Sequence, residues 1–147
     1  MSGIFLTLWD DVEQFDRVLK PTPSNHPHIT ICYSGKKLEI KKLMELGNGI
    51  LKDLFGKTIT LTKARINSFF HERKGKERHD ILVDIEEEKE IELTRQTHLQ
   101  SVSDRVIMRK PHVTVKSSWD KDDVMKELND INKILPITVK VNGICYK

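Results

Sequence analysis

Two four-residue segments of this chain repeat one pattern. Residues 28–31 read His-Ile-Thr-Ile and residues 112–115 read His-Val-Thr-Val, 84 positions further on, and each segment follows a proline. Side chains alternate between the two faces of a β-strand, so the His and the Thr of each segment share one face and the apolar pair shares the other. Proline is tolerated at the start of a strand. The repeat therefore predicts two strands that each have a buried apolar face and a polar face bearing an imidazole and a hydroxyl.

A single copy of this pattern would indicate only a half-buried strand with a surface histidine, but two copies side by side would have the groups that a phosphoester reaction needs. Imidazole has an ordinary pKa of ~6.5, so near neutral pH one histidine can accept a proton while the other donates one. We expect His28 and His112 to be this acid–base pair, worth ~10²–10⁴-fold in rate per group. Thr30 and Thr114 would donate hydrogen bonds to the non-bridging phosphate oxygens.

The same residues argue against a metal site. Each His-x-Thr-x segment supplies one metal ligand, and no Cys, Asp or Glu stands beside it at ligand spacing. We therefore expect catalysis with no metal and no other cofactor.

The paired motifs resemble the 2H phosphoesterases, which carry two His-x-Thr/Ser-x motifs (x apolar) on strands of two pseudo-symmetric lobes. The first copy continues as His-Ile-Thr-Ile-Cys-Tyr-Ser-Gly to Gly35, like the family's usual run, whereas the second departs from that run after Val115. The resemblance covers essentially the whole chain, from Gly3 to Tyr146. It implies an α+β fold of two pseudo-symmetric lobes of antiparallel sheet flanked by helices, with the active site in the cleft between them.

The resemblance also implies a reaction at a ribose 2′ oxygen. Three substrate types follow from it: 2′,5′-oligoadenylates, cyclic dinucleotides such as 2′,3′-cyclic GMP–AMP, and RNA or nucleotides that end in a 2′,3′-cyclic phosphate. Because little of the chain lies outside the two lobes, it resembles compact viral members that destroy nucleotide second messengers of immunity, and this 2′-phosphodiesterase is our main hypothesis. The alternatives are an RNA-type 2′,3′-cyclic phosphate phosphodiesterase and a non-catalytic nucleotide-binding module.

Length and composition bound the class of protein. A chain of 147 residues predicts one domain, residues 1–147, that buries roughly 70% of its unfolded surface. Charged residues make up 32% and the net charge is +3, which is weaker than in a dedicated nucleic-acid binder. We therefore expect a small nucleotide substrate, a monomer, and no stable duplex nucleic-acid partner.

The sequence also indicates a compartment. No apolar run approaches membrane-spanning length, and the first residues lack the features of a signal peptide. The two cysteines, Cys32 and Cys145, are widely spaced and need no disulfide. These features predict a cytoplasmic protein, in the host cytosol if the protein is viral, without membrane association.

Hydrophobic periodicity predicts an alternation of strands and helices. A short helix is expected after Asp10, and the charged segment 71–79 is expected as a hairpin tip. The other predicted elements are strands at about 3–9, 27–34, 57–69, 80–86, 111–117 and from 137 onward, and helices at about 38–54, 88–102 and 120–135.

Weaker site candidates come from strand alternation. Lys116 lies an even number of residues from His112 and Thr114, so strand alternation places it on the same face. It is therefore predicted to neutralise a phosphate, with an ordinary solvated lysine as the alternative. Trp9 at the end of the first strand is predicted to stack on a base, with core packing as the alternative. Cys32 is expected to be a small filler near the site.

Other chemistry-bearing residues receive plainer interpretations. Tyr33 and Trp119 are further stacking candidates. The hairpin segment carries Arg73, Lys74, Lys76 and Arg78, which would either guide an anionic substrate or form a solvated turn. The histidines outside the motifs are expected to be surface or strand-end residues: His26, His71, His79 and His98.

Overall fold

The structure of the chain is a computed structural model, and it describes residues 2–8, 28–34, 40–99 and 110–146. The short helix expected after Asp10 and the position expected for Trp9 lie outside these ranges. In chain order the elements are β1 (Ser2–Leu8), β2 (His28–Ser34), α2 (Ile40–Leu54), β3 (Thr58–His71), β4 (Lys76–Ile85), α3 (Glu88–Leu99), β5 (His112–Ser118), α4 (Lys121–Ile134) and β6 (Ile137–Tyr146).

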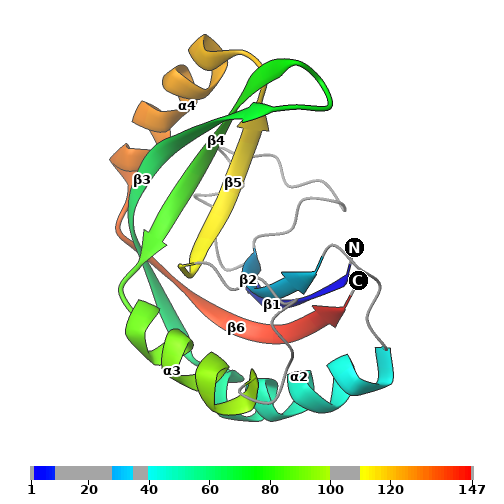
Figure 1. Ribbon diagram of the computed structural model, residues 1–147. Coiled ribbons are helices and arrows are strands. Elements are labelled where there is room, and N and C mark those ends of the chain that lie inside the picture. The colour runs from blue at the N-terminus through cyan, green and yellow to red at the C-terminus, as the bar shows by residue number, and fades with distance from the viewer. Residues whose placement is uncertain (1, 9–27, 35–39, 100–109, 147) are drawn as a thin grey trace.

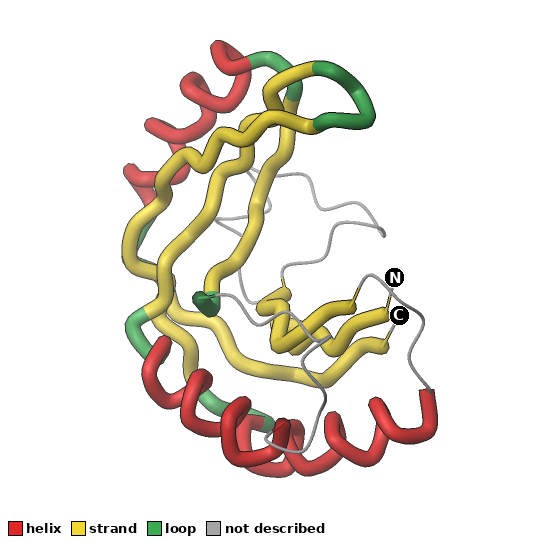
Figure 2. The backbone as a smooth tube through the Cα atoms, in the orientation of Figure 1, coloured by secondary structure: helices red, strands yellow, loops and turns green. Residues whose placement is uncertain are grey.

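The six strands form one strongly curved antiparallel sheet in the order β1-β2-β5-β4-β3-β6, which closes where β6 pairs with β1. Helices α2 and α3 lie outside one end of the curve and α4 lies outside the other (Figure 1). We call the face of the sheet that is turned away from these helices the inner face, and the opposite one the outer face (Figure 2). The predicted α+β class, with antiparallel sheet flanked by helices, is confirmed.

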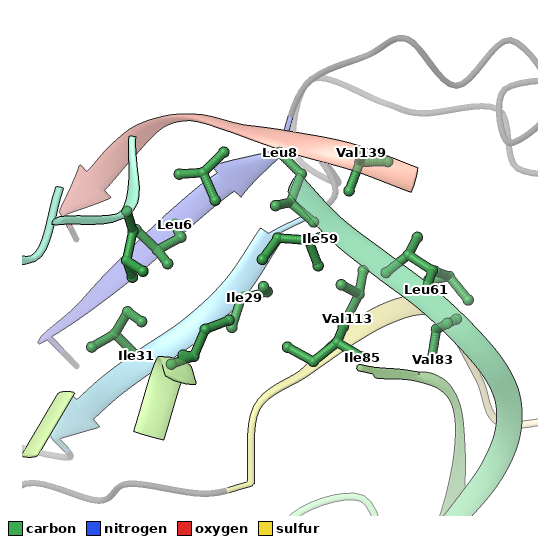
Figure 3. Packing of buried hydrophobic residues seen from close by; sticks show 14 of the residues in the cluster. Leu6, Leu8, Ile29, Ile31, Ile59, Leu61, Val83, Ile85, Val113 and Val139 are labelled. Atoms are coloured by element: carbon green, nitrogen blue, oxygen red, sulfur yellow. The ribbon is translucent and has the colours of Figure 1, made fainter. Parts of the chain in front are cut away.

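The hydrophobic core lies between the outer face of the sheet and the three helices. Alternate apolar residues of the strands point into it, and the labelled side chains in Figure 3 include Ile29 and Ile31 of β2 and Val113 of β5. From the helices, Ile50 of α2 and Ile91 of α3 are fully buried in the same cluster. This burial is the main stabilising contribution to the fold, at roughly 25 cal/mol per Å² of apolar surface removed from water.

Local signals place the helix ends where the sequence predicted them. Helix α2 stops at Leu54, and Gly56 follows with a φ of +74°, a conformation that favours glycine. Helix α4 begins after Asp120, whose side chain accepts a hydrogen bond from the Asp122 amide, and it ends before Pro136. None of the helices in the described ranges is long and apolar enough to cross a membrane.

The β3–β4 hairpin is longer than the sequence indicated. The turn occupies only residues 72–75, because Gly75 adopts a φ of +61° and permits a tight reversal. The expected tip at 71–79 is therefore wrong at both ends, since His71 pairs with Lys76 and the ladder continues through Arg78. Runs of charged residues resemble a loop in sequence, but a solvated two-stranded ribbon accommodates them equally well.

Candidate functional site

The two motif strands meet side by side. β2 pairs with β5 in antiparallel orientation, with Ile29 opposite Val113. Ile29 and Val113 are the one pair that defines the register of these two strands. If it continues by one residue in each direction, we expect His28 opposite Thr114 and Thr30 opposite His112, so that each histidine faces the threonine of the other motif.

Burial separates the two faces of these strands as predicted. Ile29 and Val113 have no exposed surface, whereas the His and Thr residues on either side of them are half-buried. Opposite residues of an antiparallel pair lie on the same face with Cβ atoms about 4.5–5.5 Å apart, and diagonal neighbours about 7–8 Å apart. His28 and His112 are such a diagonal pair, so the register predicts a spacing that a phosphate group can bridge.

Both motif strands contain a β-bulge at the residue after the threonine. In β2, Thr30 pairs with Phe5 and Cys32 with Ile4, which leaves Ile31 as the extra residue. In β5 the register shifts in the same way around Val115. A bulge inserts one residue into the alternation, so the position that follows turns to the other face. The polar row that the His and Thr begin on the inner face is thereby interrupted, because the residue directly after each bulge turns to the outer face.

The bulge removes Lys116 from this row. Lys116 pairs with Ile81, a core residue, and its ammonium contacts α4 at Glu127 Oε1 (2.5 Å) and Asp123 Oδ2 (3.2 Å). Burial is the largest single influence on the pKa of Lys116 and lowers it, but the hydrogen bonds and charges of the two carboxylates together raise that pKa above its ordinary value. Strand alternation does not hold at this position, and we leave Lys116 out of the proposed site.

Cys32 occupies the equivalent position in β2 and also turns to the outer face. It is buried in the core, and burial raises the pKa of its thiol. It is thus a core residue rather than part of the polar row. Both Cys32 and Cys145 are free thiols.

His112 is oriented by a hydrogen bond to the backbone. Its Nδ1 lies 2.8 Å from the carbonyl oxygen of Lys110, and because a carbonyl can only accept, Nδ1 carries the proton. The nitrogen left for proton transfer is therefore Nε2, whether the ring is neutral or protonated. A hydrogen bond from one ring nitrogen to a backbone carbonyl commonly fixes the tautomer of a functional histidine.

His28 is held by an aromatic contact. The Phe5 ring of β1 packs edge-on against it, with centroids 5.4 Å apart and planes at 89°. Gly3 leaves room for that ring, because a Cβ at position 3 would lie 2.7 Å from Phe5 Cζ and 2.9 Å from the Cys32 carbonyl oxygen. Gly3, the second residue of β1, thus makes room for the ring that contacts His28.

The structure adds two charged residues that the sequence reasoning missed. Asp84 of β4 pairs directly with His112, so it lies on the inner face beside it. The Nε of Arg65 on β3 donates to both Asp84 carboxylate oxygens, at 3.1 and 3.3 Å. The only hint in the sequence is that Asp84 interrupts an otherwise apolar run, Ile-Leu-Val-Asp-Ile. Arg65 and Asp84 therefore form an ion pair on the inner face beside His112.

The remaining histidines have structural surroundings of their own. His79 is only 5% exposed, with Nδ1 2.6 Å from the Ser68 hydroxyl, so the expectation of a surface residue is wrong for it. His98 pairs with Asp53 of α2 at 2.6 Å. His71 packs edge-on against Trp119. Among the described residues, no cluster of three or more His, Cys, Asp or Glu side chains could hold a metal ion.

Comparison with known proteins identifies the fold. The sequence matches no protein-family model and no curated protein. The structure is similar to Usb1 from Kluyveromyces marxianus, with a TM-score of 0.53 and 13% sequence identity over 99% of this chain and 96% of Usb1. It is also similar to the same protein solved with uridine monophosphate, with a TM-score of 0.51 and the same identity and coverage. This chain therefore has a fold of the Usb1 type along its whole length.

Proposed function

We propose that this protein is a phosphodiesterase of the 2H phosphoesterase type that acts on RNA or nucleotides ending in a 2′,3′-cyclic phosphate. The observation that carries the proposal is the antiparallel pairing of the two motif strands at Ile29 and Val113, from which we expect each motif histidine opposite the threonine of the other motif. A fold shared with a protein solved with uridine monophosphate favours a ribonucleotide phosphate as the ligand. Uridine monophosphate is neither an adenylate nor a cyclic dinucleotide, so among the three substrate types this likeness lies nearest to the RNA-type alternative.

The proposed reaction uses the diagonal pair of histidines on opposite sides of one phosphorus. The neutral imidazole takes a proton from water, whose oxygen attacks the phosphorus of the cyclic phosphate. The protonated imidazole gives its proton to the departing ribose oxygen, and the product is an open phosphomonoester. In-line displacement places the attacking and leaving oxygens on opposite sides of the phosphorus, so the proposal needs one histidine on each side.

The threonines complete the proposed site. The hydroxyls of Thr30 and Thr114 donate to the non-bridging oxygens, where negative charge builds in the transition state. After the reaction the two histidines have exchanged protonation states, and proton exchange with solvent resets them. His112 acts through Nε2, since its Nδ1 donates to the Lys110 carbonyl.

A substrate panel with excess chelator tests this proposal. It contains a 2′,3′-cyclic mononucleotide, a single-stranded RNA ending in a 2′,3′-cyclic phosphate, linear 2′,5′-oligoadenylate, and cyclic dinucleotides with 2′,3′ and 3′,3′ linkages. We expect rapid opening of the cyclic phosphates. Faster turnover of the 2′,5′- or 2′-linked compounds would restore the immune second-messenger hypothesis and overturn the RNA reading.

The third possibility, a nucleotide-binding module without activity, makes a different prediction. Such a protein would bind a ribonucleotide but turn over no member of the panel. The two intact proton-transfer groups argue against it, because binding alone does not need them. A cytoplasmic location remains a prediction. We also predict a monomer, which size-exclusion chromatography tests, and activity without metal, which the chelator in the substrate panel tests.

A further inference from the structure

Large aromatic side chains are exposed at the end of the β3–β4 hairpin and beside it. Phe69 and Trp119 are each 40% exposed and Phe70 is 64% exposed. Figure 1 shows the hairpin tip at the opposite end of the curved sheet from β1 and β2. Exposed aromatic residues that share one face commonly mark a binding surface.

Five side chains of this region share the inner face. Phe69 pairs with Arg78, and His71 pairs with Lys76. Trp119 follows β5, where its ring packs edge-on against His71 and lies beneath the Arg78 guanidinium, 5.5 Å from the ring centroid. We call these residues the hairpin platform: Phe69, His71, Lys76, Arg78 and Trp119. Phe70 pairs with Glu77, one step along the ladder, and therefore points to the outer face.

The hairpin platform continues the face that carries the proposed site. On β4, Leu82 pairs with Thr114, and Arg78 lies four residues further along the same strand on the same face. Four residues of extended strand span roughly 13 Å. A phosphate held at Thr114 is therefore out of reach of Trp119, but further nucleotides of the same strand would pass over the platform.

Charge on the hairpin matches a polyanion. Residues 72–78 contain four basic and two acidic residues, a surplus of two positive charges in a chain whose net charge is +3. Arg78 pairs with Asp80 at 3.4 Å. Within the described ranges, no carboxylate lies at ion-pair distance from Arg73, Lys74 or Lys76. These three cations are thus available to phosphates of a bound strand.

We propose that the hairpin platform binds the nucleotides next to the reacting phosphate, so that the preferred substrate is a single-stranded oligoribonucleotide rather than a mononucleotide. Interleaved aromatic and basic side chains are the means by which proteins bind single strands, because every base can stack on a ring and every phosphate attracts a cation. The inference rests on the proposed function for the position of the reacting phosphate. A protein partner at this surface is an outcome of the test below.

The first experiment measures binding without turnover. Fluorescence anisotropy of a labelled single-stranded oligoribonucleotide is recorded with His112→Ala as the parent, and Phe69→Ala or Trp119→Ala is added to it. We expect each addition to weaken binding roughly tenfold, the loss of one stacked base. Trp119→Phe should retain most of the affinity. Phe70→Ala is the matched control, since it removes the same side chain one residue away on the outer face, and it should change nothing.

The salt dependence separates the cations from the rings. Lys76→Gln should lower the slope of log Kd against log salt concentration by about 0.7, the value for one phosphate contact on a single strand. Lys52→Gln on α2, far from the hairpin, is the control. Equal losses for Phe69→Ala and Phe70→Ala, or equal affinity for duplex RNA, would overturn the platform. No RNA binding by the parent would also overturn it, and would point to a protein partner.

A kinetic comparison distinguishes this inference from the proposed function. In the otherwise unchanged protein, kcat/KM is measured for a cyclic-phosphate oligoribonucleotide and for a cyclic mononucleotide. Trp119→Ala should lower the ratio of the first value to the second roughly tenfold. A ratio that does not change overturns the platform while leaving the phosphodiesterase assignment intact. Absence of all hydrolysis by the unmodified protein defeats the assignment, and the binding measurement then still tests the platform.

Discussion

The two motif strands, β2 and β5, are alike in pattern but different in surroundings. Each has a buried apolar side, a half-buried His and Thr, and a bulge directly after the threonine. The next residue after the bulge is Cys32 in the core of one lobe and Lys116 beneath the carboxylates of α4 in the other. The shared features keep the His and Thr of each strand on the face opposite the buried apolar residues. The features that differ, Cys32 and Lys116, contribute to the packing of each lobe and not to the polar face.

Each motif histidine also has a contact of its own. His112 donates a hydrogen bond from Nδ1 to the Lys110 carbonyl, which fixes its tautomer, and the Phe5 ring packs perpendicular to the ring of His28. The proposed mechanism needs the two imidazoles to differ in protonation state, because one must accept a proton while the other donates it. Residue-specific contacts such as these are the means by which a protein sets such a difference.

The largest effect should come from removing either histidine. His28→Ala and His112→Ala are each expected to lower kcat/KM for a cyclic-phosphate substrate by ~10²–10⁴-fold. The double variant should be little worse than either single one, because both groups act in one step. His98→Ala is the control, since His98 pairs with Asp53 away from the motif strands. Full activity in either single motif variant would contradict the paired site.

The pH profile tests whether the two halves are unequal. A site that needs one neutral and one protonated imidazole predicts a bell-shaped dependence of kcat/KM on pH, with a maximum near neutrality. In each single histidine variant, residual activity should lose one limb of the bell, and the limb that disappears tells which histidine is the base. A rate that still rises well above neutral pH would indicate a different nucleophile.

Removing the threonine hydroxyls should have an intermediate effect. Thr30→Val and Thr114→Val keep the size and shape of the side chain but lose the donor, at a cost of about 1–3 kcal/mol for a hydrogen bond to a charged group. That corresponds to roughly a 5- to 150-fold loss in kcat/KM, and a twofold-related pair predicts similar losses for the two. A loss confined to one threonine would show that the phosphate lies against one strand only.

A smaller effect is expected from Gly3→Ala. The added Cβ meets the Phe5 ring and the Cys32 carbonyl oxygen, so the ring that contacts His28 must move. Overpacking of this kind costs about 1–3 kcal/mol of unfolding free energy. We expect lower kcat with thermal unfolding only modestly shifted, and Phe5→Leu should reproduce the loss in kcat. Normal kcat in both would separate Phe5 from the function of His28.

The smallest effect on activity is expected at Lys116. Lys116→Met should leave kcat/KM unchanged and lower the unfolding free energy by about 1 kcal/mol through loss of the contacts to Glu127 and Asp123. The pKa of Lys116 is raised in the folded protein, so its stabilising contribution is complete below the ordinary value of 10.5 and fades as pH rises through the higher folded value. The stability difference between the two proteins should therefore narrow only in strongly alkaline solution. A large loss of kcat/KM would return Lys116 to the site.

Much of the fold was predictable because its signals are local. The alternation of Ile137, Val139 and Val141 predicted β6, and the spacing of apolar residues predicted α2 and α4 within about two residues. The hairpin boundaries were not predictable in this way. A charged run does not report whether its residues are paired across a ribbon, and only the cross-strand ladder from Phe69 to Arg78 settles it.

The sequence by itself determined which residues carry the proposed site: the repeat marked His28, Thr30, His112 and Thr114, since alternation within one strand is a property of backbone geometry. Only the tertiary structure decided how they meet, through the antiparallel register of two strands 84 positions apart. It also moved Lys116 to the outer face and set Asp84 beside His112. The physical reason is that a bulge and a register depend on which residues of a partner strand lie alongside. The residue pattern of one strand carries no information about that pairing.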